Sequence, residues 1–280
     1  SDAVLLARAR AVGTFNCASV FMYSALAMLS LAHGQAATST TDAAWFDSAG
    51  TTNYPKGANS SLSDVDDANV SYTSAGDSSA NKPLTGSGTP FAKTTHNGQD
   101  TGVADLNGAM WQALLGVTYP ATNATDGSTI QTTDIWVLKE STALADLTEG
   151  HNSGTDAWGN ASHLGALYGE QTGLLPWDPA SATSVFWGNG SNQALDPSVS
   201  GQKWLKTALA VHKDSASVSA SGSNLFGQDR FSQRVEENLF AVASGSWGLG
   251  SNAGVWRRNW RNSRTTGSSS FGFRAAAYGL

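Results

Sequence analysis

The chain has 280 residues, only 14% of them charged, and a formal net charge of −6 at neutral pH. A chain of this length can bury a core without disulfides, and its acidic balance does not suggest nonspecific nucleic-acid binding. The single cysteine, Cys17, excludes an internal disulfide framework and a cysteine-based zinc site, and its apolar neighbours favour burial over reactivity.

The N-terminal region is predicted to be helical over residues 1–35, because Ala, Leu and Met dominate and Pro is absent. Two arginines before an apolar run at Val20–Ala32 imitate a secretory signal peptide. The run starts late, however, two serines interrupt it, and it is far too short to span a bilayer. We therefore expect a buried core helix over Tyr23–Gly34, ended by Gly34 as its C-terminal cap, with a targeting signal as the alternative.

The middle of the chain contains two irregular stretches, at about 36–100 and 140–230, rich in Ser, Thr, Asp, Asn and Gly. Such composition is typical of surface insertions. Between the two stretches, Gly102–Gln112 predicts a compact core element with Trp111 pointing inward, and Trp136–Lys139 predicts a short strand. Ser184–Gly188 is a further candidate strand. We expect one domain, covering 1–280, that carries these insertions.

The last 36 residues, Gly245–Leu280, hold three Trp and five Arg among Gly, Ser, Asn and Thr, with no Asp or Glu. Trp and Arg are enriched at binding hot spots, and Ser, Gly and Asn are the adaptable residues of antibody-type binding loops. The chain before Asn238 must then carry about −11, so a basic segment is attached to an acidic body. Strands are predicted over Ala241–Trp247, leading into this segment, and over Phe271–Ala275, closing it.

Patterns that carry catalysis or bind metals are missing from the sequence. The five His are not spaced as metal ligands, and neither a Walker-type phosphate loop nor a convincing Gly-x-Ser-x-Gly turn occurs. The acidic cluster in the first insertion lacks the spacing of a calcium loop and is interpreted as a solvated face: Asp64, Asp66 and Asp67. The sequence thus predicts a protein without catalytic residues, cofactor or metal.

The order of blocks in the tail, GSW, GSNAGV, NW-x-N and GFRA over residues 245–275, resembles the variable region of proteins diversified by diversity-generating retroelements. Gly102–Gln112 is similar to the G-V-x-D-L-x-G-N-V-W-E core motif of the same family, and Asn53–Gly57 and Thr95–Gly98 also resemble segments of this group. The resemblance touches most of the chain. It implies an α+β C-type lectin fold of the subtype shared with formylglycine-generating enzymes, which is loop-rich with short antiparallel strands and few helices.

The resemblance also implies a function. In this family a reverse transcriptase copies a template repeat with errors at adenines, and the copy replaces the variable region of the gene. The expected protein is a non-enzymatic receptor on a virus tail or cell surface, and its ligand is a protein or surface polymer with acidic or aromatic features. The ligand-binding residues implied by the resemblance are Gly248, Leu249, Trp256, Arg257, Arg258, Trp260, Arg261, Thr266, Ser268, Ser270 and Phe271. The implied scaffold residues are Trp111, Trp247, Phe273 and Arg274, and Asn252, Asn259 and Asn262 are framework or unmutated Asn.

Two other functions stay open at this point. A lectin of fixed specificity could stack exposed Trp on sugar rings, although the Glu-Pro-Asn calcium motif of ordinary C-type lectins is missing. A formylglycine-type enzyme is disfavoured, because that activity uses a copper-binding pair of cysteines and this chain has one Cys. The tail could also be an ordinary C-terminal strand and loop, but this does not explain why Trp and Arg alternate in a polar segment.

Overall fold

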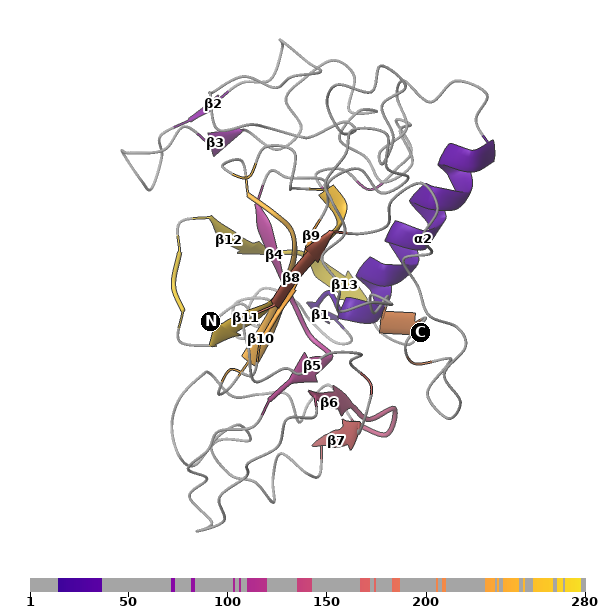
Figure 1. The fold of residues 1–280 in the computed structure, drawn as a ribbon, viewed down its shortest axis with the longest axis vertical. Coiled ribbons are helices and arrows are strands. Elements are labelled where there is room, and N and C mark those ends of the chain that lie inside the picture. The colour runs from indigo at the N-terminus through magenta and orange to yellow at the C-terminus, as the bar shows by residue number, and fades with distance from the viewer. Residues whose placement is uncertain are drawn as a thin grey trace.

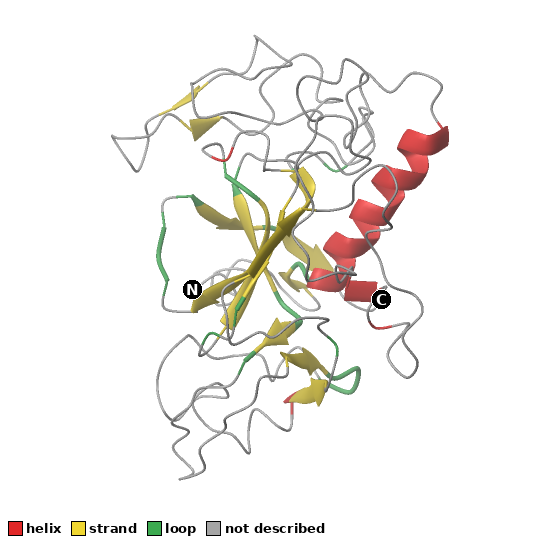
Figure 2. Ribbon diagram, in the orientation of Figure 1, coloured by secondary structure: helices red, strands yellow, loops and turns green. Residues whose placement is uncertain are grey.

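The computed structural model shows a sheet-rich α+β fold, in which short strands and loops surround one long helix (Figures 1 and 2). This confirms the α+β class. The structure describes residues 15–36, 72–73, 82–83, 103, 106, 110–119, 135–142, 167–171, 174, 183–186, 205, 208–209, 230–234, 236, 239–246, 249, 254–263, 266–268 and 270–277. The motif segments at 53–57 and 95–98, the acidic cluster at 64–67, and Trp247, Gly248 and Asn252 lie outside the described residues.

A six-stranded mixed sheet forms the centre of the fold, with the strand order β12-β4-β10-β11-β9-β8 (Figure 1). Its strands are β4 (Trp111–Leu114), β8 (Thr183–Phe186), β9 (Arg230–Gln233), β10 (Leu239–Ser244), β11 (Gly254–Ser263) and β12 (Phe271–Phe273). Three of the neighbouring pairs are antiparallel, whereas β11 with β9 and β12 with β4 are parallel. The expected antiparallel pattern therefore holds for part of this sheet only.

Three smaller sheets complete the described fold. β5 (Val117–Thr118), β6 (Ile135–Leu138) and β7 (Tyr168–Gln171) form an antiparallel sheet, which confirms the strand predicted near Trp136. The Thr118 hydroxyl donates to the Leu239 carbonyl at 2.9 Å and so attaches this sheet to β10. The remaining two are two-stranded: β1 (Phe15–Cys17) with β13 (Ala275–Ala277), and β2 (Tyr72–Thr73) with β3 (Lys82–Pro83).

The helix α2 runs over Val20–Ala36 and begins at a side-chain cap, because the Met22 N–H donates to the Ser19 hydroxyl at 3.2 Å. One face of α2 is buried, through Val20, Tyr23, Ser24 and Ala27. The predicted core helix is thus confirmed, but burial is one-sided, and Leu29 is 47% exposed. None of the helices among the described residues is long and apolar enough to cross a membrane.

Two details of the N-terminal prediction are wrong. α2 continues past Gly34 to Ala36, so Gly34 is not its C-terminal cap; a glycine inside a helix costs only about 1 kcal/mol, which one buried face can offset. Residues 15–17, predicted as helix, form β1 instead, because they pair with β13 from the other end of the chain.

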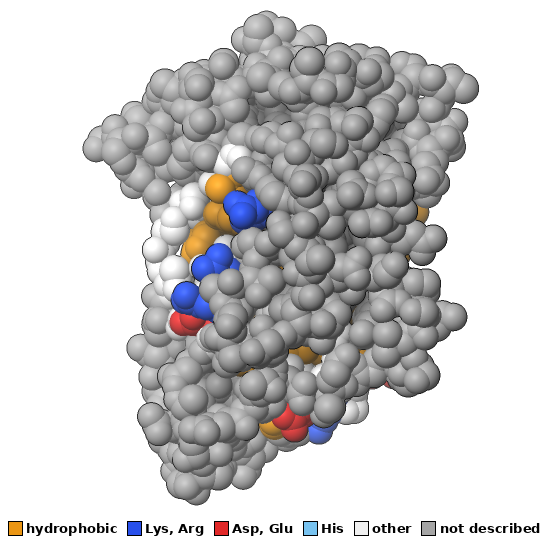
Figure 3. All heavy atoms as spheres, viewed as in Figure 1, with side chains coloured by type: hydrophobic (Ala, Val, Ile, Leu, Met, Phe, Trp, Pro, Cys, Tyr) orange, Lys and Arg blue, Asp and Glu red, His pale blue; other side chains and the backbone are white. Residues whose placement is uncertain are grey.

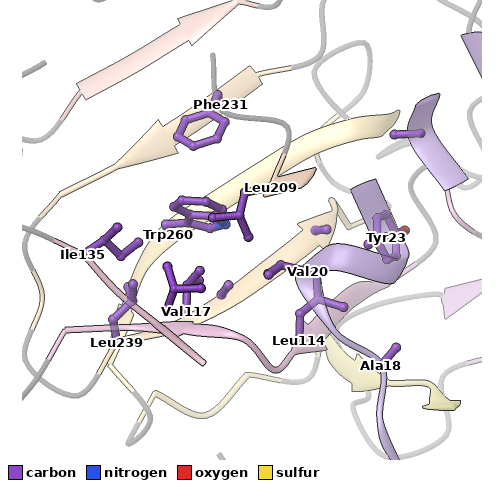
Figure 4. Packing of buried hydrophobic residues seen from close by; sticks show 14 of the residues in the cluster. Ala18, Val20, Tyr23, Leu114, Val117, Ile135, Leu209, Phe231, Leu239 and Trp260 are labelled. Carbon is purple, nitrogen blue, oxygen red and sulfur yellow. The ribbon is translucent and has the colours of Figure 1, made fainter. Parts of the chain in front are cut away.

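The main core lies between α2 and one face of the six-stranded sheet. Figure 4 shows the Trp260 ring beside Leu209 and Phe231, and Trp260 and Phe231 meet edge to face with ring centroids 5.0 Å apart. Three core residues come from the range predicted as the second insertion: Leu174, Leu205 and Leu209. The range 140–230 is therefore more than a surface insertion, since it fills part of the core.

Within Gly102–Gln112 the described residues include Leu106 and Trp111, and the inward orientation predicted for Trp111 is confirmed by its burial. Leu106 is fully buried, its carbonyl accepts a 2.9 Å hydrogen bond from the Tyr23 hydroxyl, and Trp111 is buried. Just beyond, Gly116 has a φ of +118°, and a Cβ there would lie 2.8 Å from Cγ2 of Val20. The close approach of α2 to this turn therefore requires glycine.

Cys17 is buried, and its thiol donates to the Ala113 carbonyl at 2.9 Å, which confirms the predicted packing role. Burial raises the pKa of the thiol from 9.0 to about 12. Between these two pH values the unfolded thiol ionises while the folded one does not. The stability that Cys17 contributes is therefore complete below pH 9.0 and falls as the pH rises toward about 12.

We expect Cys17→Ala to remove this pH dependence. Between pH 8 and about pH 10.5, the free energy of unfolding of the parent chain should fall by about 2 kcal/mol more than that of the variant. Urea unfolding at both pH values measures the difference. Parallel losses in the two proteins would show that the Cys17 thiol is not protected by burial.

Candidate functional site

The six-stranded sheet has a second face, opposite the main core, with its own cluster of apolar side chains. Along β10, Leu239, Ala241 and Ala243 belong to the main core, whereas Phe240 and Val242 belong to the second cluster. This is the alternation expected of a strand. The other members of the second cluster are Trp111 and Ala113, with Leu249, Phe271 and Phe273 packed against them. We call this side of the sheet the outer face.

The side chains of β11 divide between the two faces. Asn259 pairs with Val242 and therefore lies on the outer face, whereas Arg258 pairs with Ala243 and lies on the core face. Arg257 belongs to the outer face as well, because its guanidinium lies 5.3 Å from the centre of the Trp111 ring. Two irregularities in the pairing of β10 with β11 modify the simple alternation.

Three residues expected on the ligand-binding surface lie in the core instead. Trp256, Arg258 and Trp260 are fully buried. The Arg258 guanidinium lies 5.2 Å from the centre of the Tyr23 ring on α2, and its Nη1 donates to the carbonyls of Val255 at 2.8 Å and Arg257 at 3.0 Å. The expectation that these three side chains are exposed in a loop is wrong, because this part of the tail is a strand paired between β10 and β9, with α2 packed against it.

The structure brings several of the other predicted binding residues together. Phe271 meets Phe240 edge to face at 5.6 Å between ring centroids, and Leu249 packs against the same cluster, next to Trp111 and Arg257. Leu249 and Phe271 are half-buried, whereas Arg257 is buried at 6% exposure, so the expectation that Arg257 lies exposed in a loop is also wrong. Arg261, near the end of β11, is half-buried and lies at the irregularity in the pairing of β11 with β10. On the outer face, aromatic rings lie beside the Arg257 guanidinium.

The segment between β11 and β12 carries the predicted polar binding residues. Thr266 and Ser270 are half-buried, and Ser268 is exposed. Hydrogen bonds shape the segment: the Thr266 N–H donates to the Ser263 carbonyl at 2.9 Å, and the Ser268 and Ser270 hydroxyls are 2.8 Å apart. It therefore offers hydroxyl groups beside the outer face.

Three of the predicted scaffold residues hold this region to the rest of the fold. The Trp111 N–H donates to the Ser270 carbonyl at 2.9 Å, and the Arg274 carbonyl accepts a 2.8 Å hydrogen bond from the Ala18 N–H. Phe273 packs against both the outer-face cluster and the cluster around Cys17. It is half-buried, so the expectation that it is a buried anchor is met only in part.

The part of the sequence that forms β11 and β12 is rich in arginine. Figure 3 shows Lys or Arg side chains next to apolar ones, with an acidic side chain beside them, on the described surface. The sequence from 238 to 280 contains five Arg and no acid. Glu236, just before it, already forms an ion pair with Arg234, with Nε and Oε2 2.7 Å apart.

Sequence reasoning missed Phe240 and Val242 as members of this face. Their strand reads LFAVAS and is buried at every position, so no alternation of polar and apolar residues distinguishes its two sides. Asn259, which the sequence predicts to be a framework or unmutated residue, lies on the outer face because it pairs with Val242. Only the register of the neighbouring strands reveals these positions.

Within the described ranges, no group of three or more His, Cys, Asp or Glu side chains is arranged to hold a metal ion. A scan against protein-family models and a search of curated proteins both find no match to the chain.

Proposed function

We propose that this protein is a non-enzymatic receptor that binds a protein or surface-polymer ligand on the outer face and on the adjoining segment 266–270. The observation that carries the proposal is the division of β11. Trp256, Arg258 and Trp260 fill the core, while Arg257 and Asn259 lie on the other side of the same strand. On that other side Asn259 is half-buried, whereas Arg257 is buried against Trp111 and so supports this face rather than being exposed on it.

This division is what a diversified receptor needs. A surface that must accept many substitutions cannot contribute to the core and has to be carried by a rigid framework. The diversified positions that we propose are Leu249, Arg261, Thr266, Ser268, Ser270 and Phe271. The buried residues of β11 are excluded from this set and are proposed as framework: Trp256, Arg257, Arg258 and Trp260.

The fold and its display are part of the same proposal. A mixed sheet of short strands, extensive loops and one long helix are consistent with a C-type lectin fold of the formylglycine-generating-enzyme subtype. Display on a virus tail or on a cell surface follows from the same family resemblance. Arginines beside aromatic rings favour a ligand with acidic or aromatic groups, because guanidinium pairs with carboxylates and stacks on rings.

Sequencing the genomic DNA next to this gene tests the proposal. We expect a near-copy of the segment that encodes residues 245–275, with a reverse transcriptase gene close by. Differences between the two copies should occur at adenines of the template and should fall on codons of residues outside the core, such as those of Arg261, Ser268 and Phe271. The codons of Trp256, Arg258 and Trp260 should match. Absence of the copy and of the reverse transcriptase would overturn the diversified-receptor proposal.

A further inference from the structure

The N-terminal segment 15–20 joins the end of the tail to the chain just after β4. On one side, β1 pairs with β13, and the Ala18 N–H donates to the Arg274 carbonyl at 2.8 Å. On the other side, the Ala18 carbonyl accepts from the Leu115 N–H at 2.9 Å, and the Val20 N–H donates to the Leu115 carbonyl at 2.8 Å. Backbone hydrogen bonds therefore attach this segment on both sides, and we call residues 15–20 the N-terminal clamp.

Two short strands attach the tail to the rest of the fold beyond β11. β12 supplies three residues, which pair in parallel with β4 at one end of the described six-stranded sheet. β13 follows after Arg274 and supplies three more, which pair with the N-terminal clamp. Phe273 connects the two attachments, because it packs against both the outer-face cluster and the cluster around Cys17. A three-residue parallel pairing is weak by itself, since short pairings fray and parallel ladders are slightly less stable per residue.

We infer that the N-terminal clamp holds the segment 266–271 in position and so fixes, from the other end of the sequence, part of the proposed recognition surface. This inference rests on the proposed function and specifies how that same surface is positioned. The clamp acts on the backbone through β13 and β12, whereas Thr266, Ser268 and Ser270 are proposed to contact the ligand through their side chains. Substitutions at these three positions therefore leave the clamp intact, as a diversified surface carried by a rigid framework requires.

The pairing of β1 with β13 shows which backbone groups form the clamp. In an antiparallel pair, hydrogen-bonded residue pairs alternate with pairs that are not bonded to each other. Because Ala18 bonds to Arg274, the next bonded pair is Asn16 with Ala276, and the Ala275 N–H points away from β1. A proline at position 276 therefore removes a hydrogen bond of the clamp, whereas a proline at position 275 does not.

Hydrogen exchange of the full chain, read by mass spectrometry, tests the inference. Ala276→Pro should raise the exchange rate of amides in 266–273 at least about tenfold and change those of β10 little, because the opening is local. The Phe271 N–H, donated to the Ser268 carbonyl at 3.1 Å, is one of the reporters. Two controls should exchange like the parent chain: Ala275→Pro, which adds proline without breaking the clamp, and Ala276→Val, which enlarges the side chain but keeps the N–H.

The inference is overturned by unchanged exchange of 266–273 in Ala276→Pro, by equal acceleration in the two proline variants, or by equal acceleration of β10. The parent chain gives a second measurement that stands even where a variant does not fold. In low concentrations of urea, the amides of β13 and of 266–273 should exchange through one common opening, before those of β10. Separate openings would also contradict the clamp. A matching template repeat found together with any of these results would leave the receptor function standing.

Discussion

Trp260→Ala is expected to lower the free energy of unfolding by about 4 kcal/mol, the usual cost of deleting a fully buried aromatic side chain. Trp260 is completely buried in the main core and meets Phe231 edge to face at 5.0 Å between ring centroids. Its removal loses this ring contact and opens a cavity beside Leu209 (Figure 4). Urea unfolding followed by circular dichroism measures the change without depending on tryptophan fluorescence.

The matched control for this variant is Phe271→Ala on the outer face. Phe271 is also aromatic and also meets another ring, but it is half-buried, so we expect a loss of about 1 kcal/mol. Equal losses for the two variants would contradict the assignment of Trp260 to the framework and Phe271 to the binding face.

Arg258→Ala is expected to lower the free energy of unfolding by about 3 kcal/mol. Substitution of an exposed arginine usually changes it by no more than about 0.5 kcal/mol. The substitution removes the cation over the Tyr23 ring and the donor to the carbonyls of Val255 and Arg257. It also leaves space between α2 and β11. Removal of a buried charge also regains some desolvation free energy, so the expected loss of about 3 kcal/mol is the net value. Urea unfolding at neutral pH measures the effect.

Arg261→Ala removes the same charge from the same strand and is the control for Arg258→Ala. Because Arg261 is half-buried, we expect the free energy of unfolding to change by no more than about 0.5 kcal/mol. Arg258→Met restores most of the lost volume without the donors and should lie between the parent and Arg258→Ala. A loss at Arg261 as large as that at Arg258 would contradict the two-sided interpretation of β11.

Local composition was enough to predict some of the fold. The helix near Tyr23 and the strand near Trp136 have strong helix-forming and strand-forming compositions, and both are found at nearly the predicted positions. The burial of Cys17 and Trp111 was also predicted, since both occur in apolar or compact segments. These features depend mainly on residues close together in the chain.

The central error concerned residues 254–263. Gly, Ser and Asn around Trp256 and Trp260 indicate a loop, but pairing with β10 and β9 makes the segment a strand, and such tertiary pairing overrides local propensity. The partner that buries Arg258 is Tyr23, which lies near the other end of the sequence. The sidedness of β11 depends on pairing irregularities that shift which side chains reach the core, and no pattern within the segment reveals them.

The most direct test of the account compares two randomised libraries of this chain. The first, the outer library, varies the half-buried and exposed positions Arg261, Thr266, Ser268, Ser270 and Phe271, and the second varies the core positions Trp256, Arg258 and Trp260. Resistance to proteolysis sorts folded members from unfolded ones. We expect most members of the outer library to fold and few members of the core library to do so. Comparable survival in the two libraries would contradict the claim that β11 holds the fold with one side and presents a recognition surface with the other.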